Sequence, residues 1–328
     1  MKSLAKTVCI LGSALLLSAE ERDRSTLSIT IENDSFLGTD RYYTHGMRMQ
    51  YMHRPNELPS WAVKGLSHLP NVGMEISSMR IGGALGQELY TPANLRARAL
   101  IVNDRPYGAW MHGSLILRRS GQLRESVGVM DELELDVGVV GPEALGEETQ
   151  QWWHDTVDYI DPKGWDNQLE SEPAVQLFLN RSLQFRFETS DFWGLDIVPH
   201  GKVALGNIYV YGEVGSLFRF GYNLPREYTI SPMESFSTHP SANDADWSFY
   251  GFLGADGRVV GRNLFLDGNT FESSHSVDRE LLVADFRVGG AVRYKGVEGV
   301  VSLVKRTREF KAQVNDEAFL SVTMQFHF

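Results

Sequence analysis

The last nine residues, Leu320 to Phe328 with the sequence LSVTMQFHF, alternate between apolar and polar side chains. Successive side chains of a β-strand point to opposite faces of the sheet, so a period of two gives the strand one apolar and one polar face. The apolar face would meet a core in a soluble sandwich, or lipid in a transmembrane barrel whose lumen takes the polar face. This segment alone does not distinguish a soluble sandwich from a transmembrane barrel.

The same alternation recurs along the chain, and no helix pattern accompanies it that could cover so many strands. Clear examples are residues 27–32, 47–51, 132–139, 175–188 and 285–295. We count about a dozen such segments, and an open sheet of that size would need its edges protected, which closure achieves. The ending on Phe328, in mid-pattern, is typical of the last strand of outer-membrane barrels. We therefore expect an all-β protein, an antiparallel transmembrane β-barrel with an even strand number, most simply twelve.

Composition agrees with a barrel and excludes other classes. The 328 residues include 17 Phe, 12 Tyr, 7 Trp and 31 Gly, and the single cysteine, Cys9, lies in the N-terminal segment described next. After residue 19 no apolar run approaches the length of a transmembrane helix. The net charge of −11 opposes a nucleic-acid partner. We expect a monomer in contact with outer-membrane lipids.

The N-terminal segment has the layout of a secretory signal peptide. Lys2 and Lys6 precede an apolar stretch over residues 7–17, and Ser18-Ala19 offers a cleavage point before a charged run. The sequence therefore predicts a signal peptide over residues 1–19 and a single barrel domain over residues 20–328, in the bacterial outer membrane.

Residues 141–162, GPEALGEETQQWWHDTVDYIDP, break the strand pattern. Acidic residues at the start suit a helix N-terminus, the two tryptophans and later apolar residues fall at helical spacing, and Pro162 ends the run. We expect a short amphipathic helix in an extracellular loop, with its tryptophans either at the lipid interface or packed on the barrel rim. Residues 221–246 and 262–279 are polar and aperiodic, and we expect loops there.

Candidate catalytic residues gather near the start of the chain. The sequence has no G-x-S-x-G elbow, no H-E-x-x-H and no phosphate-binding glycine loop. Asn33 and Asp34 end the first predicted strand and Thr44 opens the second, so a hairpin brings them together. Strand parity can place Asp34 and Thr44 on one side of the wall. The Asp34 carboxylate, the Asn33 amide and carbonyls of the glycine-containing turn form an oxygen-rich set that suits Ca²⁺. Asn and Asp also cap turns, which is the simpler interpretation of these residues alone.

His154 lies on the predicted helix among carboxylates that could tune it toward base function. A lone helical histidine is weak evidence by itself.

Several motifs, in this order and spacing, resemble the LpxR-like outer-membrane lipid A 3′-O-deacylases. They are ENDSF (32–36), TDRYYTHG (39–46), DRPYGAW (104–110), GPEALGEETQQWWH (141–154) and GWDNQLESEP (164–173). The resemblance spans most of the chain after the predicted signal peptide and is specific in its first half. It implies a twelve-stranded barrel that removes the 3′-linked acyl chains of lipid A, within lipopolysaccharide, in a Ca²⁺-dependent manner.

The resemblance also implies site residues. The family's Asn-Asp pair falls on Asn33 and Asp34, its threonine on Thr44 and its catalytic histidine on His154. Its phosphate-binding lysine has its nearest counterpart in Arg96, and arginine can also grip phosphate. The implied chemistry has His154 activate a water that attacks the ester, while Ca²⁺ held by Asp34, with Asn33, stabilises the oxyanion.

One position departs from the family pattern. A glutamate follows the family's histidine by six residues, and Ile160 stands there in this chain. Asp158 or Asp161 could replace it, either in orienting the histidine or in completing the metal shell.

Two other functions stay open at this point. One is a passive porin or structural barrel, supported by the charged lumen face. The other is an outer-membrane phospholipase with a Ser-His-Asn site, for which Ser35 is available.

Overall fold

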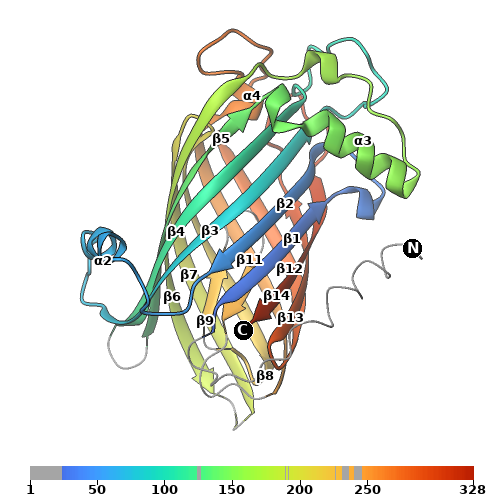
Figure 1. Cartoon of the computed structure of the whole chain (residues 1–328). Coiled ribbons are helices and arrows are strands. Elements are labelled where there is room, and N and C mark those ends of the chain that lie inside the picture. Colours follow the sequence, from blue (N-terminus) through green and yellow to red (C-terminus); the bar gives the residue numbers. More distant parts are fainter. Residues whose placement is uncertain are drawn as a thin grey trace.

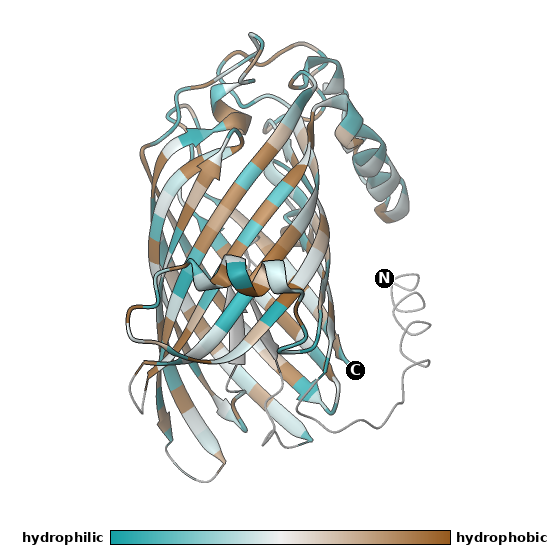
Figure 2. Cartoon of the chain, turned by 60° about the vertical axis from the view of Figure 1, so that its left-hand side comes forward, coloured by the Kyte–Doolittle hydropathy of each residue, from teal (hydrophilic) through white to brown (hydrophobic). Residues whose placement is uncertain are grey.

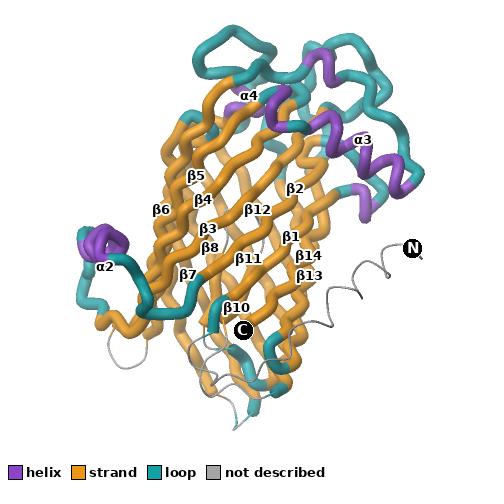
Figure 3. Tube along the Cα trace, in the orientation of Figure 1, coloured by secondary structure: helices purple, strands orange, loops and turns teal. Residues whose placement is uncertain are grey.

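The computed structural model describes residues 24–123, 127–188, 190, 192–225, 227–230, 236–239 and 246–328. Within these ranges twelve antiparallel strands close into one barrel, shown in Figure 1 and as a trace in Figure 3. The predicted fold class is confirmed. The barrel strands are β1 (Thr26–Asn33), β2 (Tyr42–Met52), β3 (Glu75–Thr91), β4 (Gly108–Leu123), β5 (Val127–Val140), β6 (Glu172–Glu188), β7 (Trp193–Gly206), β8 (Tyr209–Tyr222), β11 (Trp247–Asn263), β12 (Leu282–Tyr294), β13 (Val297–Arg306) and β14 (Glu317–His327).

Short helices lie in the connections between these strands. They are η1 (Ser35–Leu37), α2 (Ser60–Ser67), η2 (Pro142–Ala144), α3 (Gly146–Val157), η3 (Trp165–Asn167) and α4 (Leu264–Asp267). Helices α3 and α4 lie at the end of the barrel opposite the C-terminus, and α2 lies toward the other end (Figure 1).

The barrel closes where its first strand meets its last. Thr26 lies opposite His327, and the antiparallel register continues to the end of β1. Just beyond, the backbones of Ser25 and Phe328 exchange two hydrogen bonds, with N···O distances of 2.8 and 3.0 Å. The alternating final segment is therefore the strand that removes both edges of the sheet.

The alternation has the predicted consequence for the two faces. Thr30 and Thr323 share a hydrogen bond inside the barrel, and Ser321 donates one to Glu32 there. Hydrophobic and hydrophilic positions alternate along the strands in Figure 2. On β14 the residues whose side chains face outward are the apolar ones, Leu320, Val322, Met324 and Phe326.

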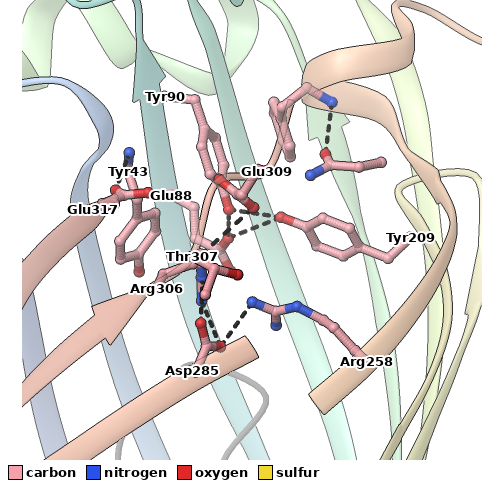
Figure 4. A network of polar contacts seen from close by, with 12 residues as sticks. Tyr43, Glu88, Tyr90, Tyr209, Arg258, Asp285, Arg306, Thr307, Glu309 and Glu317 are labelled. Carbon is pink, nitrogen blue, oxygen red and sulfur yellow. Dashed lines mark hydrogen bonds and ion pairs between the residues drawn. The ribbon is translucent and has the colours of Figure 1, made fainter. Parts of the chain in front are cut away.

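Paired charges fill the lumen. Arg219 and Asp196 form a fully buried ion pair, and Arg306 Nε lies 2.8 Å from Asp285 Oδ1 (Figure 4). Charges removed from water are tolerated only when they are paired and hydrogen-bonded. The lumen is thus a polar core.

Helix α4 closes the lumen at the end that carries α3. Phe265 is fully buried and stacks on Tyr90, with 4.1 Å between ring centroids, in a cluster that includes Tyr43 and Phe319. The cavity lined by this cluster and the nearby charges measures about 60 Å³. Such packing opposes a passive pore, and it contradicts the expectation that residues 262–279 are only loop, because an apolar four-residue helix gives no periodic signal.

The expectation of a loop over residues 221–246 is also wrong in part. Strands β9 (Glu227–Ile230) and β10 (Phe236–His239) form a separate two-stranded sheet there. The predicted signal peptide, residues 1–19, lies outside the described residues. Among the helices of the described residues, none is long and apolar enough to span a membrane.

Candidate active site between the barrel wall and helix α3

Helix α3 confirms the predicted insertion, and it packs against the rim of the barrel. It begins after Leu145, whose left-handed backbone turns the chain, and ends at Val157. Trp153 is buried, with its ring edge-on to Phe36 and near His45, each at 6.0 Å between centroids. This tryptophan therefore packs on the rim, whereas Trp152 is 65% exposed.

His154 points from α3 to an aspartate that sequence reasoning did not single out. Its Nε2 lies 2.8 Å from Oδ2 of Asp40 in an ion pair whose side chains are both almost fully buried. Gln150 donates a hydrogen bond to the other Asp40 oxygen and accepts one from the Trp165 indole. Asp40 lies within the TDRYYTHG motif, so the signal was present, but an aspartate in a polar turn looked like a turn residue.

The second nitrogen of His154 shows how the ring is oriented although Ile160 stands where the family pattern has a glutamate. Its Nδ1 lies 2.5 Å from the backbone carbonyl oxygen of Ile160. Asp158, in the left-handed conformation with φ 56°, ends α3 and folds the following residues back toward the histidine. A backbone carbonyl thus orients the imidazole here, so neither the Asp158 nor the Asp161 side chain is needed for that contact.

This arrangement predicts that the Ile160 side chain matters little. Ile160→Ala keeps the carbonyl, so we expect kcat/KM for ester hydrolysis within about threefold of wild type, since the hydrogen bond is unchanged. Asp158→Val should cost far more than Asp158→Gly, because a β-branched residue resists the left-handed conformation that glycine adopts freely. A large loss in Ile160→Ala, or equal losses in the two Asp158 variants, would contradict the carbonyl assignment.

The surroundings of His154 favour its charged form. Burial alone lowers the pKa of His154, but the hydrogen bond and charge of Asp40 outweigh it, with help from the Ile160 carbonyl and Asp161. The net direction is a pKa above the ordinary value of histidine. The contact with Asp40 therefore favours the imidazolium form of the ring.

The sign of this shift can be tested directly. We expect the His154 resonance, in calcium-free protein in detergent, to titrate above the ordinary histidine pKa. In Asp40→Asn the titration should move to lower pH, because burial remains while the largest opposing interactions are lost. NMR of selectively labelled histidine measures both midpoints, and His154→Gln assigns the signal. An unchanged midpoint in Asp40→Asn would refute the ion pair.

Asp34 is a buried carboxylate with an unused oxygen. It is 1% exposed, its Oδ2 accepts a hydrogen bond of 2.8 Å from the Arg41 backbone N–H, and its Oδ1 has no partner. Burial, followed by the negative charges of Asp40 and Glu317, raises the pKa of Asp34 well above its usual range. A buried carboxylate with a free oxygen, close to a second carboxylate, fits a hard cation such as Ca²⁺, which takes carboxylate and carbonyl oxygens.

Asn33 precedes Asp34 in the chain but makes different contacts. Its Oδ1 accepts from the backbone N–H of Ser35 at 2.7 Å and from the Ser35 hydroxyl, and its Nδ2 lies 3.3 Å from His45 Nδ1. Asn33 therefore shapes the turn into η1 and fixes His45 beneath Trp153. Its service as a calcium ligand stays a prediction.

Thr44 and Arg96 lie at the edges of the site. Thr44 is part of a bulge where the register of β2 against β3 shifts, and its hydroxyl lies 2.6 Å from that of Thr91. The bulge changes the parity that sequence reasoning assumed, because Tyr43 now reaches the lumen and donates to Glu32. Arg96 is exposed, and its positive charge acts on Tyr159, whose ring is edge-on to His154 at 5.3 Å.

The structure thus brings together Asp34, Asp40 and His154, with Asn33 adjacent and Thr44 and Arg96 peripheral. Ser35 donates to Asn33, and His154 Nε2 faces Asp40, so the serine-histidine contact needed for a Ser-His-Asn site is not formed.

A second set of possible metal ligands lies in the lumen. His200, Glu213 and Asp256 lie close enough to share an ion. Lys202 is 3.3 Å from Glu213, and Arg287 is paired with Asp256. These cations already neutralise the cluster, whereas the Asp34 carboxylate on the rim keeps an oxygen without a partner.

Comparison with known proteins agrees with this picture. The model of the family described as "Outer membrane protein LpxR" matches residues 4–328. The structure of LpxR from Salmonella typhimurium superposes with a TM-score of 0.73 at 21% identity, covering 92% of this chain and 100% of that one. The β domain of the Bordetella autotransporter BrkA reaches a TM-score of 0.48 at 10% identity, covering 93% of this chain and 100% of that one. No curated protein sequence matches the chain. The chain is located in the outer membrane and belongs to the LpxR family of outer-membrane proteins.

Proposed function

We propose that this chain is a lipid A 3′-O-deacylase, a Ca²⁺-dependent hydrolase that removes 3′-linked acyl chains from lipopolysaccharide in the outer membrane. Family membership supports a lipid A deacylase in general terms. The observation that carries the proposal is the His154–Asp40–Asp34 constellation, which joins a positioned imidazole to a buried carboxylate, Asp34, with an unpartnered oxygen. Its place between the barrel wall and α3, beside outward apolar strands, suits an ester held in a membrane.

Each residue has a chemical role in this proposal. The Ile160 carbonyl accepts from the Nδ1 proton of His154, so Nε2 is the nitrogen that would take a proton from water once Asp40, which contacts it in this structure, turns to a bound cation. Asp40 sets the direction in which Nε2 points and favours the charged ring that proton transfer produces. Arg96 offers a positive charge at the exposed edge, where an anionic lipid A phosphate would approach.

Calcium would be held by Asp34 and Asp40, and when bound it would polarise the ester carbonyl and stabilise the oxyanion. The unpartnered Asp34 oxygen and the raised pKa of Asp34 are the features that fit it.

The alternatives have less support. The packed cluster around Phe265 opposes a passive porin. The engagement of Ser35 with Asn33 opposes a serine nucleophile.

The deciding experiment is mass spectrometry of lipid A treated with the purified protein in detergent. With calcium we expect product masses lower by the 3′-linked acyl groups, and with a chelator we expect unchanged lipid A. Unchanged lipid A in both conditions would contradict the activity, whereas equal hydrolysis in both would contradict the calcium requirement. The same measurement on lipid A from cells with and without this chain checks the reaction in the membrane.

A further inference from the structure

An apolar groove runs down the outer wall of the barrel across β1–β5. It is open to the outside and has a volume of about 580 Å³. Its sides are outward apolar side chains, of which Leu85 is 63% exposed and Val137 56% exposed. Its floor contains Gly83 and Gly113, which also line it.

The two glycines create the depression because each lies between larger neighbours in the register. Gly83 is paired with Tyr51 and Leu115, and Gly113 with Leu85 and Val137. A Cβ built on Gly113 would meet only Leu85 Cδ2 at 3.9 Å and a backbone oxygen at 4.0 Å. The space above Gly113 is therefore open, and a larger side chain could occupy it.

The groove begins just below the part of the wall that contacts η2 and η3. Two residues above Leu85 on β3, Gln87 donates a hydrogen bond of 2.6 Å to the Ala144 carbonyl of η2. Met111 lies two residues above Gly113 on β4, and Val139 lies two residues above Val137 on β5. Both pack against the buried cluster that includes Ala144 of η2 and Trp165 of η3. Strands β2–β5 extend along the wall from the end that carries α3 toward the other end (Figure 1). The groove is thus continuous with the wall below the site.

The number of β2 residues between the site and the groove gives the distance that separates them. His45 lies beneath Trp153 at the site, and Met49 is the first groove residue on that strand. Four strand residues span about 14 Å, at about 3.4 Å per residue. A hydrocarbon chain that leaves an ester at the site must extend that far before its end enters the groove.

We propose that this groove receives the distal part of the acyl chain whose ester is cut, and that it makes hydrolysis sensitive to chain length. This inference rests on the proposed deacylase activity. The lining is apolar, and the groove begins about 14 Å below the site on the same wall, so the substrate's own saturated chain is the occupant that matches both features. Short chains end before the groove, and long chains gain contact with its floor.

The experiment fills the groove and measures chain-length preference. Purified Gly113→Leu is compared with wild type on lipid A carrying a decanoyl or a tetradecanoyl chain at the 3′ position. We expect the tetradecanoyl-to-decanoyl ratio of kcat/KM to fall about tenfold, the scale on which apolar pockets discriminate chain length. Gly257→Leu is the matched control, because Gly257 lies on β11, away from β1–β5, with nothing within 4 Å of an added Cβ.

The outcomes separate this inference from the activity on which it rests. Leu115→Ala widens the groove, and we expect it to move the ratio in the opposite direction. Heat-dependent gel mobility checks that each barrel has folded. A ratio that stays at the wild-type value in both groove variants, with hydrolysis intact, would overturn the groove and leave the deacylase standing. Absence of hydrolysis of both lipids by the wild type would overturn the deacylase and this inference with it.

Discussion

Replacing His154 with alanine should lower kcat/KM for lipid A deacylation by about 10²–10⁴-fold, the usual contribution of a positioned general base. The Ile160 carbonyl and Asp40 fix the position of this ring, so alanine removes a base whose place in the site two contacts define. The loss should appear mainly in kcat, because the imidazole acts on water rather than on the bound lipid.

The measurement is the initial rate of fatty-acid release from lipid A by the purified variant at saturating calcium. His68→Ala is the control, since His68 is exposed and bonded to its own helix near the other end of the barrel. We expect that control to match wild type. Full activity in His154→Ala would remove the histidine from the mechanism, and loss in both variants would indicate damage to the barrel.

The barrel was predictable because its signal is repeated. Each alternating segment constrains one strand, and the final segment also shows how the sheet ends, with Thr26 opposite His327 at the closure. Helix α3 was predictable because twelve residues are long enough for helical spacing to differ from strand spacing. Helix α4 was not, because four apolar residues fit a strand or a helix equally well.

The site was predictable only where side chains carry the chemistry. Asp34 and His154 are recognisable as residue types within motifs. The partner of His154 Nδ1 is a backbone carbonyl, and any residue can supply one, so no residue type at position 160 could reveal it. The bulge at Thr44 was hidden for a similar reason, because strand parity assumes an unbroken register.

Asp34→Asn is the second large effect, and it should uncouple activity from stability. The change is nearly isosteric, and the new carbonyl can still accept the hydrogen bond from the Arg41 backbone. It removes the charge that would hold calcium beside the developing oxyanion. We expect activity to fall about 10²–10³-fold, the loss seen when one oxyanion stabiliser is removed.

The stability of the calcium-free protein should change in the opposite direction. The pKa of Asp34 is raised in the folded state by burial, then by Asp40 and Glu317. A raised carboxyl pKa means that stability is fully present below the unfolded pKa and is lost as pH rises through the folded pKa. Calcium-free wild type should therefore lose stability from acidic toward neutral pH. Asp34→Asn lacks this ionisation, so at neutral pH it should melt at a higher temperature than calcium-free wild type.

Calcium should reverse the order of the melting temperatures of wild type and Asp34→Asn. A ligand that binds only the folded state at about one hundred times its Kd stabilises by about 2.7 kcal/mol. Wild type should gain this stabilisation and Asp34→Asn should gain little, as followed by circular dichroism melting with and without the ion. Asp278→Asn, an exposed acidic residue in the connection between α4 and β12, should respond to calcium like wild type. Equal stabilisation of wild type and Asp34→Asn would place the calcium elsewhere, because a cation bound at Asp34 must distinguish a carboxylate from an amide at that position.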